Sequence, residues 1–450
     1  MKRTVCILLA LTLLLGVFSQ TVFAVGSVVG YPTPISSDDA QVKWIEKFGT
    51  SYLDAPSSVT VAGDYLLIMS KTSLLKIERS SGKTVASAAM ADDPGFTYVP
   101  VCYSDGVVYC PLNNATIQAF DVKTMKSLWI YHDVLGGQSL TPIVVENGKL
   151  YTGFWNDEDK YANFICLDVK DENTKNDSEE KSPDWTFKSL GGFYRTECKI
   201  IGNCLYVGSD DGTVYSDKAS KVFSLDKSTG TKVDSLDTVG DIRSGISESS
   251  GKLFFVSKAG YLYSVTVSNG KFNKSSLKKL ALGGSSTSTP LIYGGRVYVG
   301  VQGARISSGY IKVVDEKNLT VIYSAETKGY PQSDFLLSNK YESETGNVYV
   351  YFTYNCPPGG MCALVDSAGQ TQAQLFDVYV PDSSQSGYCI SPVVADSDGT
   401  LYFKNDSGHI FAIEKKQQQQ PQQPEKQSFF KRVIEWIRSV LQKIKNLFTR

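Results

Sequence analysis

The chain has 450 residues, a formal charge of −1 at pH 7 and a moderate hydrophobic content of 42%. A chain of this length ordinarily divides into two or three domains, although a repeat protein grows by adding units and can remain one domain. The balanced charge gives no basic surplus for nucleic acid, which we do not expect as a partner. The only histidines are His132 and His409, and no CxxC pair accompanies them, so a zinc site is not expected.

The first 24 residues have the pattern of a secretory signal peptide. Lys2 and Arg3 form the charged start, Ile7–Val17 is an apolar run, and Val22–Ala24 offers a small-residue cleavage site. The alternative is a signal anchor that stays attached, but the apolar run is short for a helix that must span a bilayer. No cysteine follows the cleavage site, so a lipoprotein anchor is not expected. We therefore predict a protein that is secreted or associated with the cell envelope.

One sequence pattern then returns eight times, at a period of roughly 40–50 residues. Each copy has a turn, a short hydrophobic strand that usually contains LY or VY, and a further strand that usually ends near an acidic residue, as in SDGVVYCPL and DSDGTLYFK. Units of this length cannot each bury a core and must stack on their neighbours. All-strand repeats of this length predict an all-β, eight-bladed β-propeller over residues 25–414, with four antiparallel strands in each blade.

The last repeat, residues 388–414, has three strands and then stops. The missing fourth strand is available at the other end of the propeller, where Val42–Phe48 has the fourth-strand pattern without a blade before it. We predict that this segment pairs near Ile410–Glu414 and closes the ring, because closure removes two exposed sheet edges. Seven blades are the alternative, but they would leave one repeat unplaced.

Eight cysteines remain after the signal peptide. Cys356 and Cys362 bracket a Pro-Pro-Gly-Gly-Met loop between two predicted strands, where a disulfide would staple the hairpin in an oxidising compartment. This pair is a candidate disulfide, with two free thiols as the alternative. The other cysteines fall within strand patterns and are expected to be buried as small hydrophobic side chains.

The composition changes abruptly after the repeats. Residues 415–427 form a Gln/Pro-rich linker with nothing to bury. Residues 428–450 carry apolar side chains at helical spacing and six basic residues against one acidic residue, a charge of +5, whereas residues 25–414 carry 34 basic and 44 acidic residues, a charge of −10. We predict a basic amphipathic helix that attaches to a membrane surface or to a partner. The residues expected to make that contact are Phe430, Ile434, Trp436, Ile437, Leu441, Ile444 and Phe448.

Two stretches of the repeats resemble a known family. Ala119-Phe-Asp121-Val-Lys-Thr-Met-Lys-Ser-Leu-Trp129 and Leu225-Asp-Lys-Ser-Thr-Gly230-Thr-Lys are similar to the pyrroloquinoline-quinone-type (quinoprotein-like) propeller repeat. In that family an Ala/Leu-x-Asp ends the third strand, and Thr-Gly-Lys and Trp mark the fourth. The resemblance covers nearly all of residues 40–414 and lies in structural positions, so it bears on the fold more than on the activity.

The resemblance implies two functional branches. One contains quinoprotein dehydrogenases, which carry a quinone, a calcium ion and usually a vicinal disulfide. The other contains non-catalytic eight-bladed scaffolds similar to the outer-membrane assembly lipoprotein. This sequence has no two adjacent cysteines, is short for a dehydrogenase and lacks evident insertions to cover a quinone. The resemblance is therefore closest to the scaffold branch, and no cofactor is expected.

Catalytic and metal-binding residues are not expected either. Neither histidine has a recognisable partner, and His409 follows Ser407-Gly408 in a predicted turn. Aspartates recur at one position of the repeats, which points to hydrogen bonds that cap turns and not to chemistry. The acidic stretch Asp171–Glu180 is interpreted as a solvated loop, and the cluster Asn156–Asp159 matches no calcium-loop spacing.

Alignment of the repeats on the second-strand aromatic residue brings two arginines into one register. Arg195 lies eleven residues before Tyr206, and Arg243 lies eleven residues before Phe254. In a propeller this position is the loop that enters the innermost strand, at one mouth of the central funnel. Two neighbouring guanidinium groups there would bind a carboxylate or phosphate, whereas the alternative is that each arginine bonds loop carbonyls.

Further candidates for partner binding are Tyr98, Trp155, Arg305 and Tyr310. Tyr98 shares the register of the two arginines, and the other three are assigned to loops between second and third strands, which share a face with the funnel mouth. We predict an exported, non-enzymatic propeller that binds a protein or envelope polymer on its funnel face. The alternative is a secreted quinone-dependent oxidoreductase.

Overall fold

The computed structural model describes residues 27–94, 98–177, 179–210, 219–416 and 429–447. The chain divides into one compact unit that ends at Lys415 and a second that begins at Lys416. The predicted signal peptide and all but the first two residues of the predicted linker lie outside the described residues.

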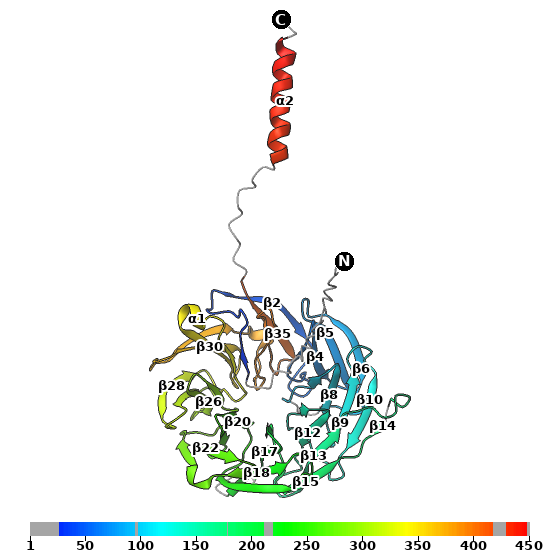
Figure 1. The fold of residues 1–450 in the computed structure, drawn as a ribbon, viewed down its shortest axis with the longest axis vertical. Helices are drawn as coiled ribbons and strands as arrows, with labels where there is room; N and C mark the ends of the chain where they lie inside the picture. The colour runs from blue at the N-terminus through cyan, green and yellow to red at the C-terminus, as the bar shows by residue number, and fades with distance from the viewer. Residues whose placement is uncertain (1–26, 95–97, 178, 211–218, 417–428, 448–450) are drawn as a thin grey trace, which may run out of the picture. The chain divides into compact units, whose positions relative to one another are not determined.

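Eight sheets are arranged in a ring around a common axis (Figure 1). Within each of seven blades the four main strands follow one another in sequence and pair antiparallel, and the eighth blade takes its outer strand from the N-terminal segment. Short turns rich in glycine, asparagine and aspartate join apolar strands, which is the local pattern that favours hairpins. The prediction of an all-β, eight-bladed propeller is confirmed.

The first four blades are formed by residues 60–239. Blade 1 contains β3 (Thr60–Ala62), β4 (Tyr65–Ser70), β5 (Ser73–Glu78) and β6 (Thr84–Ala89). Blade 2 contains β7 (Cys102–Ser104), β8 (Val107–Leu112), β9 (Thr116–Asp121) and β10 (Ser127–His132). Blade 3 contains β11 (Val144–Glu146), β12 (Lys149–Gly153), β13 (Tyr161–Asp168) and β15 (Trp185–Leu190). Blade 4 contains β16 (Lys199–Ile201), β17 (Cys204–Gly208), β18 (Ala219–Asp226) and β19 (Lys232–Val239).

The second four blades complete the ring. Blade 5 contains β20 (Ser247–Ser249), β21 (Lys252–Ser257), β22 (Tyr261–Ser268), β23 (Lys271–Phe272) and β24 (Lys278–Ala281). Blade 6 contains β25 (Leu291–Tyr293), β26 (Arg296–Gln302), β27 (Gly309–Asp315) and β28 (Val321–Thr327). Blade 7 contains β29 (Leu336–Ser338), β30 (Asn347–Thr353), β31 (Met361–Ser367) and β32 (Gln374–Tyr379). Blade 8 contains β33 (Val394–Ala395), β34 (Leu401–Lys404), β35 (His409–Lys415) and β2 (Ala40–Lys47).

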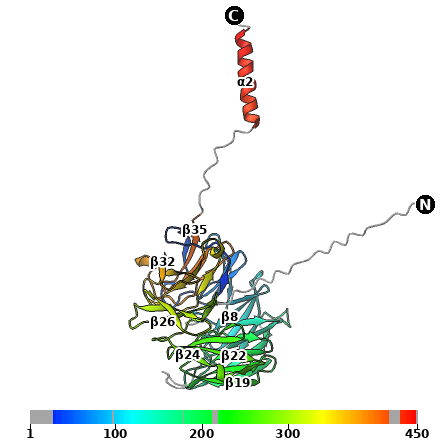
Figure 2. The same cartoon turned by 60° about the vertical axis from the view of Figure 1, so that its left-hand side comes forward.

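The N-terminal strand closes the ring as predicted. Strand β2 pairs antiparallel with β35, and Ile45 lies opposite Phe411 in the register. Figures 1 and 2 both show β35, the last strand of the propeller, beside the blue strands of the N-terminal segment. Blade 8 therefore has no unpaired outer edge on β35, which is the physical advantage that the sequence pattern indicated.

Short elements extend this framework in ways that the sequence did not predict. Strand β1 (Val28–Val29) pairs parallel with β29 and adds a fifth strand to blade 7. Strand β14 (Glu179–Glu180) pairs parallel with β10 at the edge of blade 2. The short helices are η1 (Lys274–Ser276), α1 (Glu342–Thr345) and η2 (Ser383–Gln385).

Tryptophans of the fourth strands join neighbouring blades. Trp44 of blade 8 donates its indole N–H to the Arg79 carbonyl of blade 1 at 2.9 Å. Its ring also lies against Gly82, where an added Cβ would come within 2.7 Å of the ring. Trp129 and Trp185 make the same indole bond to the next blade, at 3.0 Å each. The Gly and Trp positions of the repeat are thus two sides of one contact between blades.

Aspartates at the end of the third strands cap the following turns. The Asp121 carboxylate accepts the backbone N–H of Thr124 at 2.6 Å, and Asp226 accepts the backbone N–H groups of Ser228 and Thr229. Hydrogen bonds from the Thr124 hydroxyl to Asp121 and from the Ser228 hydroxyl to Asp226, together with these backbone bonds, hold the pKa of both aspartates below the ordinary value. The structural interpretation of the recurring aspartates is confirmed.

The second unit contains one long helix, α2 (Phe429–Leu447), which falls within the predicted range 428–450, whose other residues lie outside the described part of the chain. No described helix is long and apolar enough to cross a membrane. Phe448 lies outside the described residues, and the side-chain position of Phe430 is not described either.

Candidate functional site

The antiparallel order of the strands decides which loops share a face. The loop that enters each innermost strand and the loop between the second and third strands emerge at the same end of a blade. We call the surface formed by these two sets of loops the loop face, and the space between the innermost strands the axial channel. Five predicted partner-binding residues belong to loops of this face: Tyr98, Trp155, Arg195, Arg243 and Arg305.

Tyr310 is the exception among the predicted residues. It lies in strand β27, opposite Val301 and Glu326, and not in the loop before that strand. The assignment of Tyr310 to a loop was wrong, because β27 begins at Gly309 directly after the turn at Ser308.

Arg243 is buried in a cluster of carboxylates. Its Nε bonds Asp210 Oδ1 at 3.1 Å and its Nη2 bonds Asp210 Oδ2 at 2.6 Å. Nη2 also contacts Glu158, and Asp241 Oδ2 lies 3.4 Å away. The residue is 9% exposed. The prediction that Arg243 presents a free guanidinium at the funnel mouth was wrong, because carboxylates from blades 3 and 4 and from its own loop already surround it.

The cluster combines three carboxylates with the one guanidinium. Burial and the neighbouring Asp241 raise the pKa of Asp210 well above its ordinary value, against the opposing effect of Arg243. Burial, and then Arg243, lower the pKa of the adjacent Lys258. The charged groups therefore pair mainly with one another. A buried ion cluster needs such pairing to remain stable.

Arg195 occupies the equivalent loop of the preceding blade but has a different environment. It is half-buried, has a backbone φ of 56°, and holds its guanidinium carbon 5.6 Å from the centre of the Tyr98 ring. Its guanidinium forms no hydrogen bond or ion pair within the described part of the chain. Arg195 and Tyr98 thus form a cation–π pair at the channel mouth, which leaves the guanidinium donors available.

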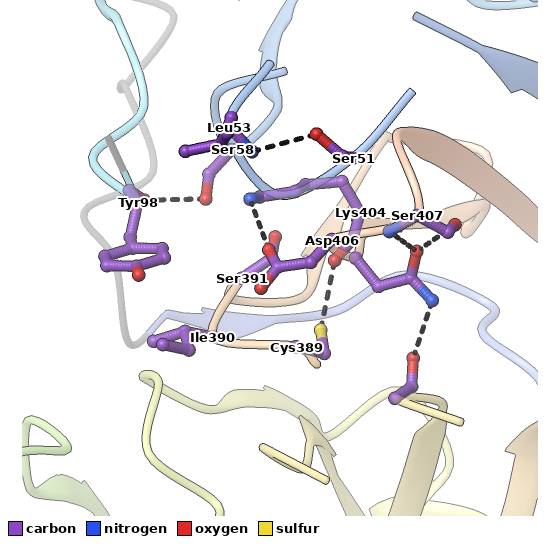
Figure 3. A network of polar contacts seen from close by, with 12 residues as sticks. Ser51, Leu53, Ser58, Tyr98, Cys389, Ile390, Ser391, Lys404, Asp406 and Ser407 are labelled. Atoms are coloured by element: carbon purple, nitrogen blue, oxygen red, sulfur yellow. Dashed lines mark hydrogen bonds and ion pairs between the residues drawn. The ribbon is translucent and has the colours of Figure 1, made fainter. Parts of the chain in front are cut away.

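A second cation approaches the same tyrosine from blade 8. Lys404 is 2% exposed, and its Nζ lies 5.5 Å from the centre of the Tyr98 ring and 3.6 Å from Asp406. Figure 3 shows Lys404 and Asp406 facing each other, with the Tyr98 ring to one side and Ser58 bonded to the Tyr98 carbonyl. Burial raises the pKa of Asp406 although Lys404 opposes the shift. Lys404 was not among the predicted site residues, because a charged residue at the end of an apolar strand gives no sign of burial in the sequence.

Trp155 contributes to the interior of the loop face more than to its surface. Its ring packs edge-on against Tyr194 at 5.2 Å, and Tyr194 in turn lies 4.3 Å from the Arg243 guanidinium carbon. The Trp155 indole N–H is buried without a hydrogen-bond partner in the described residues. Trp155 therefore supports the Arg243 cluster, and a role in partner binding stays a prediction.

Large apolar side chains are exposed on the loop face. They come from three loops that enter innermost strands and from the loop between β26 and β27, where Arg305 is also exposed. The exposed apolar residues are Tyr52 (58%), Leu53 (68%), Val134 (90%), Ile306 (62%) and Tyr388 (43%). Beside Arg305 and Ile306 lies a hollow of about 270 Å³, which is also lined by Lys258, Tyr330 and Asn355.

The candidate disulfide is not formed, since all eight cysteines of the described chain are free. Cys362 contacts the Asp377 carboxylate at 3.3 Å in its own blade, whereas the Cβ of Cys356 lies against Gly329 of the loop between blades 6 and 7. The two side chains therefore serve different contacts. The disulfide hypothesis for this hairpin was wrong. Of the other six cysteines, which were expected to be buried, five are buried and Cys204 is half-buried.

Helix α2 carries its apolar residues along one side. With about 100° of rotation per residue, Ile434, Ile437, Leu441 and Ile444 fall on one face. Trp436 lies at one edge of that face, and Arg438 and Lys445 lie at the other. These four isoleucine and leucine side chains and Trp436 are exposed.

The fold and the loop face define an eight-bladed propeller of the type named for pyrroloquinoline quinone. No family model matches the chain, and no curated protein matches its sequence. Solved structures share the fold at low identity. BamB from Moraxella catarrhalis has a TM-score of 0.56 and 11% identity, over 83% of this chain and 99% of that chain.

Quinoprotein enzymes share the same fold. A quinohemoprotein alcohol dehydrogenase from Comamonas testosteroni has a TM-score of 0.61 and 12% identity, over 87% of this chain and 79% of that chain. A europium-containing methanol dehydrogenase has a TM-score of 0.61 and 9% identity, over 85% of this chain and 95% of that chain. At such identities the similarity establishes the fold, and the fold is shared by BamB and by dehydrogenases.

The cofactors of the dehydrogenase branch can be compared with the residues present. Glu158, Asp210 and Asp241 bring carboxylate oxygens within 4.8 Å of one another, as a calcium ion would require. The Arg243 guanidinium already lies among these oxygens. A calcium ion would have to displace it, so the cluster in its present form does not fit the ion.

Proposed function

We propose that this protein is an exported, non-enzymatic propeller that binds a protein or envelope polymer through its loop face. In this proposal helix α2 attaches the propeller to an anionic membrane surface. The export signal rests on the N-terminal sequence pattern, with its charged start and apolar run.

The exposed apolar side chains of the loop face carry the first part of the proposal. Leu53, Val134 and Ile306 are each more than half exposed. They lie on surface loops, where the fold itself does not require apolar side chains. Arg305 lies beside Ile306, and a mixture of apolar residues and arginine is typical of protein interfaces. By contrast, the charged cluster around Arg243 is buried and its groups pair with one another, which is typical of residues that stabilise a fold.

The charge pattern of helix α2 supports the second part. Lys443 lies near one border of the apolar face, and Arg438 and Lys445 lie near the other. Glu435 projects from the opposite side, furthest from the apolar face. An anionic bilayer offers an apolar boundary beside negative headgroups, so it matches both features of the helix.

A capture experiment with the mature full-length chain tests the loop face. Envelope extract is passed over the immobilised protein and over the variant Leu53→Asp with Ile306→Asp. We expect a saturable partner that the wild type retains and the double variant loses, because a buried charge opposes an apolar contact. Val85→Asp is the matched control, since Val85 is 52% exposed on outer strand β6, away from the loop face. Equal capture by all three proteins would contradict the proposal.

The dehydrogenase alternative has its own test, because the fold is also that of quinoprotein enzymes. We expect added pyrroloquinoline quinone and calcium neither to raise the melting temperature nor to support dye-linked alcohol oxidation. A ligand that binds the native state must stabilise it, so a saturable rise in melting temperature would overturn the non-enzymatic proposal.

A further inference from the structure

A cavity of about 160 Å³ lies in the axial channel, and Pro100 and Pro142 line both this cavity and the pocket beside Arg195. The innermost strands of blades 1, 2, 3 and 8 provide nearly all of its wall, and their contribution is mostly apolar. Its lining residues include Val59, Val61, Val101, Ile143, Val144 and Val394. Several of these side chains are half-buried, so solvent reaches the cavity.

Blade 4 contributes the one charged residue of this lining, Glu197. Glu197 precedes β16 and is half-buried. Its carboxyl group forms no hydrogen bond in the described part of the chain, although Lys199 lies near enough to act on its charge. The backbone of Gly245 on blade 5 packs closely beside Glu197 and Thr289, since an added Cβ would lie 2.7 Å from the Thr289 hydroxyl and 3.3 Å from the Glu197 Cβ. An acidic group thus faces an apolar space without a hydrogen-bond partner from the described part of the protein.

We propose that this cavity binds a small organic cation, in which an ammonium group pairs with Glu197 and a compact apolar body occupies the valine-rich wall. An anionic ligand would find no cation among the residues that line the cavity. A neutral apolar ligand would displace water from the carboxyl group and leave it unpaired, which is unfavourable. The site is independent of the loop-face proposal, because no loop-face contact is needed to fill it.

The ionisation of Glu197 gives this site a distinctive pH dependence. Burial and the nearby Asp334 raise the pKa of Glu197 to about 8, and Lys199 opposes the shift. The thiols of Cys102 and Cys198 also face Glu197, but burial raises the pKa of both, so they stay protonated near neutral pH. The carboxyl group is therefore mostly protonated at pH 7 in the empty protein, and a bound ammonium ion must displace that proton.

Cyclohexylammonium is a suitable test ligand, and cyclohexanol is its neutral counterpart of similar shape. The amine stays protonated across the range used, because its pKa lies near that of lysine. By calorimetry on the mature full chain, we expect its affinity to rise about tenfold from pH 6 to pH 7 and to level off above about pH 8. At pH 7 the binding enthalpy should depend on the buffer, since a proton is released.

Two variants test separately the charge of Glu197 and the space in the cavity. Glu197→Gln keeps the shape of a protonated Glu197 and should lower affinity for the amine at pH 8 at least tenfold, whereas Glu326→Gln, on exposed outer strand β28, should leave it unchanged. Val394→Phe fills the cavity and should abolish binding of the amine without changing the charge of Glu197. Equal affinity for cyclohexanol and the amine, affinity independent of pH, or no binding by the wild type would each overturn the proposal.

Discussion

Arg195 and Arg243 occupy equivalent loops of adjacent blades, yet their surroundings differ. Arg243 meets Asp210 and Glu158, which come from loops between second and third strands. Arg195 meets an aromatic ring instead. The difference arises from the neighbouring loops and not from the arginines, so the register of the repeat alone could not assign their roles.

The first prediction concerns the Arg243 cluster. Arg243→Ala should destabilise the propeller by about 3–5 kcal/mol at pH 7, because three buried carboxylates lose their shared cation. The pKa of Asp210, already raised by burial, would rise further without Arg243, so the loss is largest at neutral pH and shrinks as the pH falls and Asp210 takes up a proton. Urea denaturation at pH 7 and pH 5 measures both effects.

Arg305→Ala is the control for this prediction, since Arg305 is exposed on the same face. Its effect should stay within about 0.5 kcal/mol. If both variants lose the same stability, or if the Arg243 variant is no less impaired at pH 5, the cluster does not support the fold as described.

At the scale of elements, closure of the ring depends on a single strand from the other end of the chain. Strand β2 supplies the outer edge of blade 8, and its Trp44 reaches blade 1 through both its ring and its indole N–H. The Trp44 ring also packs 5.9 Å from the ring of Tyr402. One side chain therefore links the last blade, the closing strand and the first blade.

Trp44→Ala should lower the free energy of unfolding by about 3–5 kcal/mol, because it removes a large buried side chain and a hydrogen bond between blades. Val42→Ala is the matched control in the same strand, where Val42 is 46% exposed. Chemical denaturation measures both variants. Deletion of residues 25–48 should also expose sheet edges and cause aggregation, visible by size-exclusion chromatography. A deleted chain that stays monomeric would show that β2 is not required for closure.

At the scale of the whole molecule, an acidic propeller is joined to a basic helix. In helix α2 the apolar face must be covered by some surface when it acts, and each basic residue near an anionic membrane contributes about 1 kcal/mol. Ile437→Asp with Leu441→Asp should therefore abolish binding of the full chain to anionic vesicles in a flotation assay. Raised salt should only weaken the wild type.

Ser439→Asp with Gln442→Asp is the matched control for the helix. It changes the charge equally but lies on the polar face, so it should weaken vesicle binding without abolishing it. Equal binding to neutral and anionic vesicles, or equal loss in both double variants, would argue against attachment to an anionic surface.

The sequence by itself determined the propeller, because its signals are local. Turns, alternating strands and capping aspartates such as Asp121 and Asp226 act within a few residues, and the repeat presents this pattern in eight copies. The missing strand of the last repeat also predicted the partner of β2. The amphipathic helix followed from spacing alone.

Only the tertiary structure decided how the side chains are used. Arg243 is paired with Glu158, 85 positions away in the chain, and Lys404 reaches Tyr98 from blade 8. Cys356 and Cys362 are near in sequence but serve different contacts, and the cavity that Glu197 faces is lined by strands of four other blades. Burial and charge pairing depend on which blades meet at the axis, and no local pattern contains that information.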